Sequence, residues 1–135
     1  MTNIRPINEN KYGISKHRFR ELYYFCLQYP EWQEELKHNT NTVGAIITDG
    51  LPHGSNTSDS TAILAARRAD LRTKCEIIEE TAIKADSELH EYILKAVTTE
   101  RASFNYLKMR MGLPCERDMY YDRRRKFYWL LSHEV

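Results

Sequence analysis

No glycine and no proline occurs between Ser55 and Arg110. These two residue types most often end a helix or a strand, so their absence lets regular backbone structure continue. The whole chain has only five Gly and four Pro among 135 residues, and it is rich in Glu, Lys, Arg, Leu and Ala. Because the latter residues are strong helix formers, the sequence predicts an all-α fold, a helical bundle.

The composition is that of a globular protein, with 41% hydrophobic and 29% charged residues. The first residues, MTNIRPINENKYG, are polar, and no apolar run approaches the length of a membrane span. The cysteines Cys26, Cys75 and Cys115 are too widely spaced for a CxxC metal site, and three thiols give no disulfide framework. We therefore expect a cytoplasmic protein without membrane contact, whose thiols are reduced and partly buried.

Residues 1–58 are expected to form an N-terminal helical segment that ends in a loop. A helix capped by Ser15 carries one apolar face, and Pro30 ends it and starts a shorter helix. Residues 40–58 contain several turn-forming dipeptides, which indicates a flexible loop with a short strand at 43–48. The residues of the apolar face are Phe19, Leu22, Tyr23, Cys26 and Leu27.

Residues 59–135 are expected to form a helical core that completes one compact domain with the N-terminal segment. A long helix starts near Ser58 or Asp59, and the alanines along it suggest a stripe for close helix packing. Asp86 and Ser87 offer a stop and a restart. The expected stripe includes Ala62, Ala65, Ala66 and Ala69, and the helices expected after it are Ser87–Val97, Ser103–Met111 and Cys115–His133.

The last two of these helices are joined by a short turn that contains Gly112, a residue suited to end a helix in a left-handed conformation. Two helices joined by a short glycine-containing turn match the helix-turn-helix pattern. The sequence therefore predicts a C-terminal helix-turn-helix after the helix at 87–97.

Charge separates along the chain, although the net charge is only +1. The segment 70–100 has eight acids and four bases, whereas the segment 101–135 has eight bases and four acids. Basic side chains neutralise phosphates and release counterions, and arginine can also bind guanine with two hydrogen bonds, which lysine cannot do. We therefore expect double-stranded DNA as the partner, bound by Lys108, Arg110, Arg117, Tyr120, Tyr121, Arg123, Arg124 and Lys126.

A simpler interpretation of the same segment is a solvated helix face. Asp118 and Asp122 are spaced to pair with the basic run at 123–126. Tyr120 and Phe127 recur at helical spacing with other apolar residues and would then belong to the core. A homodimer is a further expectation, because helix-turn-helix proteins often bind paired half-sites.

No catalytic set, metal site or cofactor motif is evident. The five histidines are scattered, and the chain lacks glycine-rich nucleotide-binding motifs. Cys115 would lie at a helix N-terminus, where the helix dipole lowers a thiol pKa, but no partner base is visible. We therefore expect a protein that is not an enzyme and needs no cofactor.

Two phrases, GSNTSDSTAILAARRADL and LPCERDMYYDRRRKFYWLL, resemble small phage-encoded regulators of the RinA/ArpU type from Gram-positive hosts. The resemblance covers Thr57 to Ser132 and implies a late-gene transcription activator with a sigma-region-4-like helix-turn-helix. Such a protein would bind promoter DNA and contact host RNA polymerase in the cytoplasm of the host bacterium. The resemblance makes the segment after Gly112 the recognition helix and assigns to DNA Arg117, Tyr120, Tyr121, Arg123 and Arg124.

Two other functions stay open from the sequence. The acidic stretch from Glu76 to Glu91 could mimic phosphates, as in a phage inhibitor that docks onto a host nucleic-acid enzyme. The chain could also be a small DNA-packaging (terminase) subunit that acts as a ring oligomer.

Overall fold

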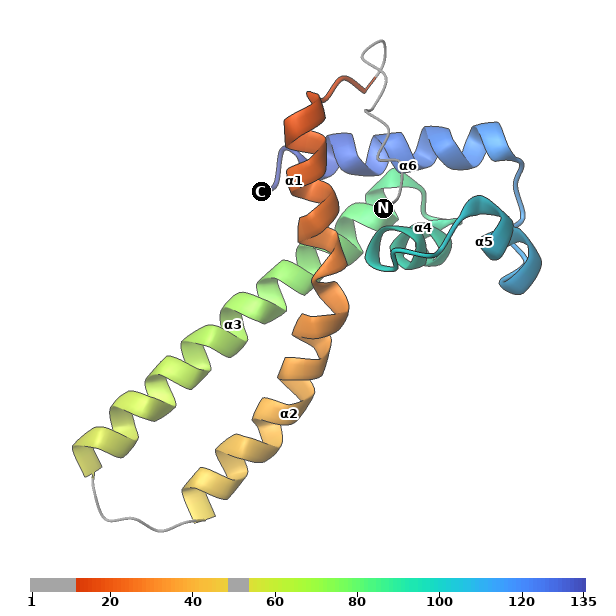
Figure 1. Cartoon of the computed structure of the whole chain (residues 1–135). Coiled ribbons are helices and arrows are strands. Elements are labelled where there is room, and N and C mark those ends of the chain that lie inside the picture. The colour runs from red at the N-terminus through yellow and green to blue at the C-terminus, as the bar shows by residue number, and fades with distance from the viewer. Residues whose placement is uncertain (1–11, 49–53) are drawn as a thin grey trace. The chain divides into compact units, whose positions relative to one another are not determined.

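The structure is a computed structural model that describes residues 12–48 and 54–135, and this part of the chain is all-helical (Figure 1). The all-α prediction is confirmed. Most of the expected breaks between helices also occur, although several boundaries differ. The helices are α1 (Lys16–Leu27), α2 (Tyr29–Thr48), α3 (Gly54–Ala85), α4 (His90–Thr98), α5 (Phe104–Arg110) and α6 (Arg117–Leu131).

The chain divides into two compact units rather than one domain with a boundary near residue 58. One unit combines Met1–Gln28 with Ile77–Val135, and the other consists of Tyr29–Glu76. α3 passes from one unit into the other because no glycine or proline interrupts it. The expected boundary at residue 58 falls inside the second unit.

In the first unit, α1, α4 and α6 contact one another. The apolar face predicted for α1 is confirmed at Phe19, Leu22 and Cys26, which are all buried. α4 contributes Ile93 and Val97, and the end of α3 contributes Ile78 and Ala82. The core is completed by α6, through Tyr120, Phe127, Tyr128 and Leu131.

The start of α1 and the break after it follow the sequence. The Ser15 hydroxyl accepts a hydrogen bond from the Arg18 backbone N–H at 3.2 Å, which caps the first turn as expected. α1 ends at Leu27, and α2 begins at Tyr29 with Pro30 in its first turn. At that position the missing N–H of proline costs no helical hydrogen bond, so Pro30 separates two helices without breaking either.

The flexible loop predicted over residues 40–58 is largely helix. α2 extends to Thr48, so the expected strand at 43–48 is also wrong, and α3 already begins at Gly54. Residues 49–53 lie outside the described part of the chain. Polar contacts between α2 and α3 stabilise the helical pair against the turn-forming preference of the local sequence. The Arg67 guanidinium forms an ion pair with Glu35, and Arg68 Nη1 donates to the Leu36 carbonyl at 2.9 Å.

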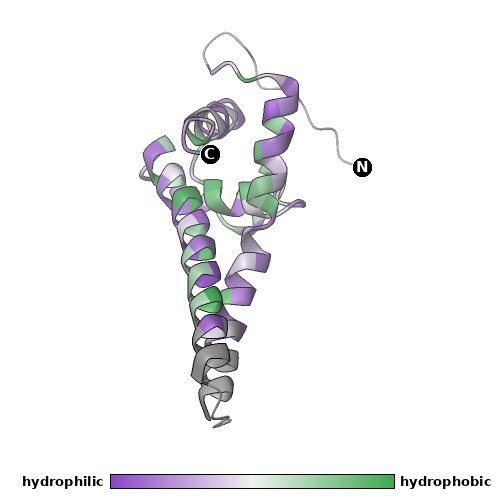
Figure 2. Cartoon of the chain, turned by 90° about the vertical axis from the view of Figure 1, so that its left-hand side faces the viewer, coloured by the Kyte–Doolittle hydropathy of each residue, from purple (hydrophilic) through white to green (hydrophobic). Residues whose placement is uncertain are grey.

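The packing seam of α3 differs from the expected alanine stripe. Its least exposed residues recur at alternating intervals of four and three, which is the spacing of a coiled-coil seam. Ala62, Ala65, Ala66 and Ala69 lie outside this seam and are exposed, whereas Cys75, Ile78 and Ala82, which continue the expected stripe, are buried in it. Figure 2 shows hydrophilic and hydrophobic residues interspersed along the helix. The seam residues are Leu64, Arg68, Leu71, Cys75, Ile78, Ala82 and Ala85.

The turn between α3 and α4 is built around Asp86. Its Oδ1 atom accepts hydrogen bonds from the backbone N–H groups of Glu88 and Leu89, both at 2.9 Å. The chain therefore stays in a turn until α4 begins at His90, three residues after the expected start at Ser87. The restart itself was predicted correctly, but the N-cap residue of α4 is Leu89, which makes no side-chain capping hydrogen bond, and the Asp86 carboxylate holds the turn before it.

α5 has the cap and the stop that its sequence predicts. The Ser103 hydroxyl accepts a hydrogen bond from the Tyr106 backbone N–H at 3.1 Å. Gly112 has a φ of 71°, the left-handed conformation expected of a glycine that ends a helix, and the Leu113 N–H then bonds to the Leu107 carbonyl.

We expect Gly112→Ala to lower the free energy of unfolding by about 1–2 kcal/mol, because an L side chain is strained at positive φ. A Cβ atom added to Gly112 meets no heavy atom within 4 Å, so the cost comes from the backbone alone. Urea denaturation followed by circular dichroism measures it. Gly112→Asn is the matched control, since asparagine tolerates a positive φ better than alanine does. This variant should therefore lose less free energy of unfolding than Gly112→Ala. Equal losses for both variants would contradict the backbone explanation.

Candidate nucleic-acid interface

The expected helix-turn-helix corresponds to α5 and α6, which lie in the same unit as α4. Their connection runs from Met111 to Glu116, which is six residues. A DNA-binding helix-turn-helix usually has a turn of about three or four residues. The order of helices therefore agrees with the motif, whereas the connection is longer than usual, and the helix-turn-helix stays a hypothesis.

Tyr120 is a core residue and not a DNA contact. Its side chain is 2% exposed, and its ring lies 5.7 Å from that of Phe104. Burial raises the pKa of its phenol to about 12. The DNA role assigned to Tyr120 is wrong because the helical phase of α6 turns this residue toward the core, together with Phe127 and Leu131.

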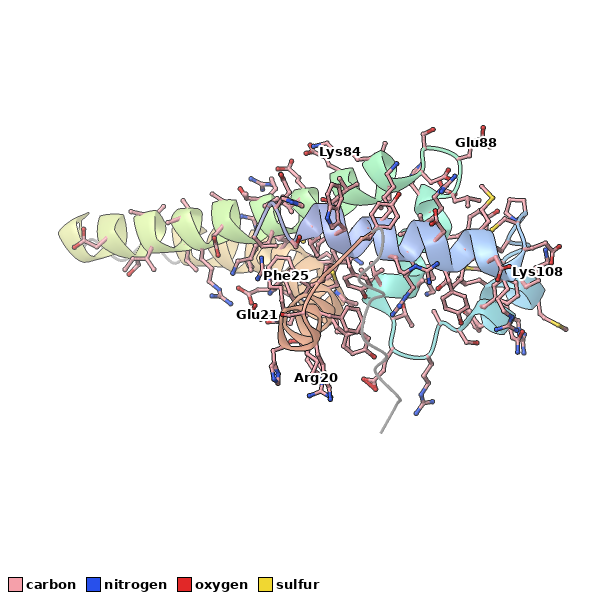
Figure 3. The ribbon with its side chains drawn as sticks, turned by 90° about the horizontal axis from the view of Figure 1, so that it is seen from above. Arg20, Glu21, Phe25, Lys84, Glu88 and Lys108 are labelled. Carbon is pink, nitrogen blue, oxygen red and sulfur yellow. The ribbon has the colours of Figure 1, made fainter. Side chains whose placement is uncertain are left out.

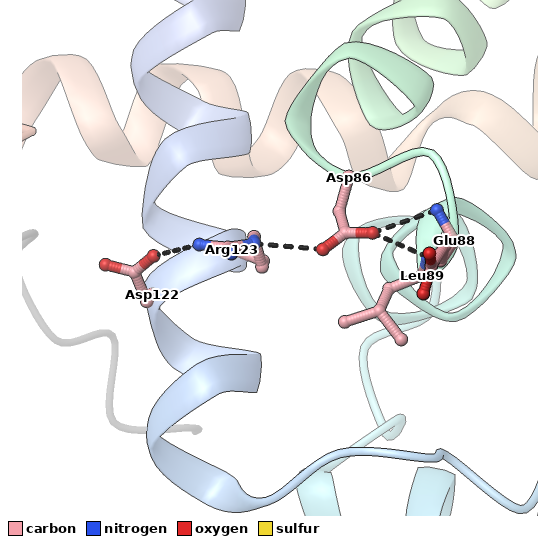
Figure 4. Close-up of polar contacts among 5 residues, drawn as sticks. All are labelled: Asp86, Glu88, Leu89, Asp122 and Arg123. Atoms are coloured by element: carbon pink, nitrogen blue, oxygen red, sulfur yellow. Dashed lines mark hydrogen bonds and ion pairs between the residues drawn. The ribbon is translucent and has the colours of Figure 1, made fainter.

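The Arg123 guanidinium is held between two carboxylates (Figure 4). Its Nε atom donates to Asp86 Oδ2 at 2.9 Å, and its Nη1 atom donates to Asp122 Oδ2 at 2.5 Å. A guanidinium engaged in this way cannot also form two hydrogen bonds with guanine unless these ion pairs break. Arg123 fastens α6 to the α3–α4 turn, and this contact contradicts its assigned role in DNA reading.

Arg124 is also turned inward. Its guanidinium carbon lies 5.1 Å from the centre of the Tyr128 ring and 5.9 Å from that of Phe19. Cation–π contacts of this kind stabilise the packing of α6 on α1. The structure therefore gives Arg124 a packing role instead of the expected DNA contact.

The remaining candidates reach the surface to different degrees. Arg117 is exposed, with its guanidinium carbon 4.8 Å from the centre of the Phe104 ring. Lys108 Nζ donates to the Cys115 carbonyl at 3.0 Å and lies 3.6 Å from Glu116 Oε1. Arg110 is exposed, and Tyr121 and Lys126 are half-buried.

Two cations that the candidate set omitted belong to the same region. Arg101 is exposed just before α5, and Arg125 is half-buried on α6. Arg125 lies within the basic run, so its charge was visible in the sequence, but only the structure shows that Arg123 and Arg124 are engaged and Arg125 is not. Among the described residues from 101 to 126, the cations that form no ion pair are Arg101, Arg110, Arg117, Arg124, Arg125 and Lys126, and of these Arg124 is packed against the buried Tyr128 and Phe19 rings.

The side of α6 that faces away from the core is electrically mixed. At 100° per residue, Asp118, Asp122 and Arg125 lie opposite the buried Phe127, and Lys126 lies to the side of this face. Two acids and one base give the face no net positive charge. The positive character of the C-terminal third is therefore strongest at the two ends of the α5–α6 connection, not along the middle of α6.

Cys115 does not have the activated thiol that its position suggested. The residue is buried, and desolvation raises the pKa of its thiol, which outweighs the nearby Lys108 charge. Cys26 and Cys75 are buried as well, and within the described residues neither forms a disulfide bond. Within the described ranges, no cluster of three or more His, Cys, Asp or Glu could hold a metal ion, and no helix is long and apolar enough to cross a membrane.

Comparison with known proteins adds no relative: no family model, no curated protein and no solved structure matches this chain.

Proposed function

We propose that the chain is a phage or prophage regulator that binds double-stranded DNA through the cations around α5 and α6 and activates late genes by contacting host RNA polymerase. The observation that carries the DNA part is the set of five cations between residues 101 and 126 that have no carboxylate partner among the described residues and, unlike Arg124, do not pack on the buried Tyr128 and Phe19 rings. Cations without ion pairs are the ones that can neutralise phosphates at no cost in broken contacts. The activating role rests on the resemblance to RinA/ArpU-type regulators.

The proposed surface is centred on the start of α6. In a helix-turn-helix, the N-terminal residues of the recognition helix contact base edges. Arg117 occupies that position, and its stacking on Phe104 restricts the orientation of its guanidinium. Arg110 and Arg101 would contact phosphates beside it, and Arg125 and Lys126 would extend the surface along α6. Arg123 and Arg124 support this surface by holding α6 in place.

The test is a gel-shift titration with fragments of the phage's own genome at several salt concentrations. Replacing Arg101 and Arg110 by alanine removes two phosphate-binding charges, so the slope of log K against log salt should fall by about 2. The matched control replaces Lys37 and Arg72, two exposed cations of α2 and α3, and should leave the slope unchanged. Equal effects of the two double variants, or no binding by the unaltered protein at low salt, would refute the proposed surface.

A further inference from the structure

The outer face of α5 exposes apolar side chains beside a positive charge. Met109 is 83% exposed, the highest fraction among the exposed large hydrophobic residues, and Tyr106 on the same face is 39% exposed. Arg110 lies one turn after Tyr106 on the helix surface and forms no ion pair with the described residues. The opposite face of α5 is buried through Phe104 and Leu107. We call Tyr106, Met109 and Arg110 the α5 patch.

A second patch of opposite charge lies near the end of α3, in the same unit. Ile83 is 47% exposed, and on the helix surface it lies next to Glu79 and Glu80, four and three residues earlier. Glu80 is exposed and Glu79 is half-buried. Lys84 follows Glu80 by one turn, so this surface carries two acids for each base. We call Glu79, Glu80 and Ile83 the α3 patch.

The two patches have the composition of the two halves of one interface. Exposed apolar groups rimmed by polar or charged residues are typical of sites where proteins bind each other. An acidic rim around Ile83 complements the positive charge beside Met109, and complementary charges favour the correct partner and orientation. Since every copy of the chain carries both patches, the partner that fits the α5 patch is a second copy.

The contact cannot close within one molecule. In Figure 3 the labelled Lys84 of α3 and Lys108 of α5, which neighbour Ile83 and Met109 in the sequence, lie well apart. We therefore propose that the chain self-associates head to tail, with the α5 patch of one copy bound to the α3 patch of the next. Such an interface joins two different surfaces, so it produces rings or filaments rather than a closed two-fold dimer. The proposal does not rest on DNA binding, but Arg110 lies in both proposed surfaces, so DNA and a second copy would compete for it and self-association is measured without DNA.

The experiment mixes two variants that each lack one patch. Met109→Glu disables the α5 patch, and Ile83→Glu disables the α3 patch. By light scattering after size-exclusion chromatography, the unaltered protein should form species larger than a dimer, while each variant alone should be monomeric, with self-association weakened roughly a hundredfold. An equimolar mixture should form a heterodimer and nothing larger, because only one intact patch of each kind remains. Larger species in the mixture, or a strictly monomeric or dimeric unaltered protein, would overturn the proposal.

Two matched controls separate the patches from a general effect of surface charge. Ile63→Glu alters the same residue type on the same helix, at a position 68% exposed, and Met119→Glu alters a 42% exposed methionine of α6. Both should assemble like the unaltered protein, and circular dichroism should show unchanged helix content in all four variants. Loss of assembly in either control to the same degree would contradict the assigned patches.

Charge exchange provides a second measurement that does not depend on removing apolar contacts. Arg110→Glu or Glu80→Arg alone places like charges together and should weaken association at least tenfold. The chain that carries both substitutions restores the pairing in reverse and should recover most of the affinity. A double variant no better than the weaker single variant would show that these two residues do not meet.

Discussion

Tyr128→Ala is expected to lower the free energy of unfolding by about 3–5 kcal/mol, the usual cost of removing a large aromatic side chain from a core. Tyr128 is fully buried, with its ring edge-on to Phe19 at 5.0 Å and to Phe127 at 5.2 Å. It also carries the Arg124 guanidinium above its face. The substitution therefore opens a cavity where α1 meets α6 and removes the partner of a cation, two losses at one position.

Tyr128→Phe should change the free energy of unfolding in the opposite direction. The Tyr128 hydroxyl is buried and has no hydrogen-bond partner in the described part of the chain, and burial raises the pKa of its phenol. A buried polar atom without a partner costs about 1–3 kcal/mol, and removing it while keeping the ring avoids that cost. We therefore expect phenylalanine to be equal to tyrosine in stability or better by about 1 kcal/mol.

Urea denaturation of the three proteins, followed by circular dichroism, gives the comparison. Phe127→Tyr is the complementary control: it adds a hydroxyl to a fully buried neighbour and should be destabilising. If Tyr128→Phe instead cost more than about 1 kcal/mol, the hydroxyl would have to bond to a buried partner, such as an ordered water.

Asp86→Ala is expected to lower the free energy of unfolding by about 2–3 kcal/mol, since it removes both a turn cap and a charge-assisted hydrogen bond. The Asp86 side chain is 12% exposed, accepts from two backbone N–H groups and pairs with Arg123 (Figure 4). Asp86→Asn is the matched control: the amide oxygen can still accept from the turn, and only the charge is lost. Asp86→Asn should therefore lower the free energy of unfolding by about half as much as Asp86→Ala does.

The same contacts make stability depend on pH. Desolvation alone would raise the pKa of Asp86, but hydrogen bonds from the Leu89 backbone, the Arg123 side chain and the Glu88 backbone together lower it below the ordinary value of 3.8. A carboxyl with a lowered folded pKa stabilises the fold fully above its unfolded pKa and loses this contribution as pH falls through the folded pKa. We therefore expect unaltered protein and Asp86→Asn to differ most near neutral pH and to converge below pH 3.8. A difference that stays constant across this range would contradict the ion-pair explanation.

A double-mutant cycle then measures the coupling free energy between Asp86 and Arg123. Arg123→Ala should cost less than Asp86→Ala, because Asp86 alone also caps the turn. The coupling between the two changes should be of the order of 1 kcal/mol, since the pair is only partly shielded from water. If Arg123→Ala leaves stability unchanged but abolishes DNA binding, Arg123 is a DNA contact after all and the packing role is wrong.

Most helices and many of their ends could be predicted from the sequence, because they are determined by interactions between residues close together in the chain. Ser15 and Ser103 cap where their hydroxyls can reach backbone N–H groups, Pro30 separates two helices, and Gly112 takes the left-handed conformation that other residues avoid. The all-α class follows from the same source, since long stretches without glycine or proline and rich in helix formers have no competing structure.

Residues 40–58 show where local signals fail. Val43–Thr48 has a strand-like composition, yet it continues α2, because contacts between distant residues such as Glu35 and Arg67 stabilise a pair of helices. Intrinsic propensities differ by less than about 1 kcal/mol per residue for most side chains, so tertiary contacts override them. The exposed alanines of α3 have the same explanation, since the choice of seam depends on the neighbouring helix.

The segment 101–135 that suggested DNA binding has some properties set by the sequence alone and others set only by tertiary contacts. Its charge contrast, its two helices and its glycine-ended α5 are properties of the sequence alone. Which of its cations reach solvent was decided only by the fold, because Arg123 meets a carboxylate 37 positions earlier and Arg124 lies over an aromatic ring of α1. A run of basic residues fixes the charge of a helix, whereas the side chains packed against that helix fix which charges remain for a partner.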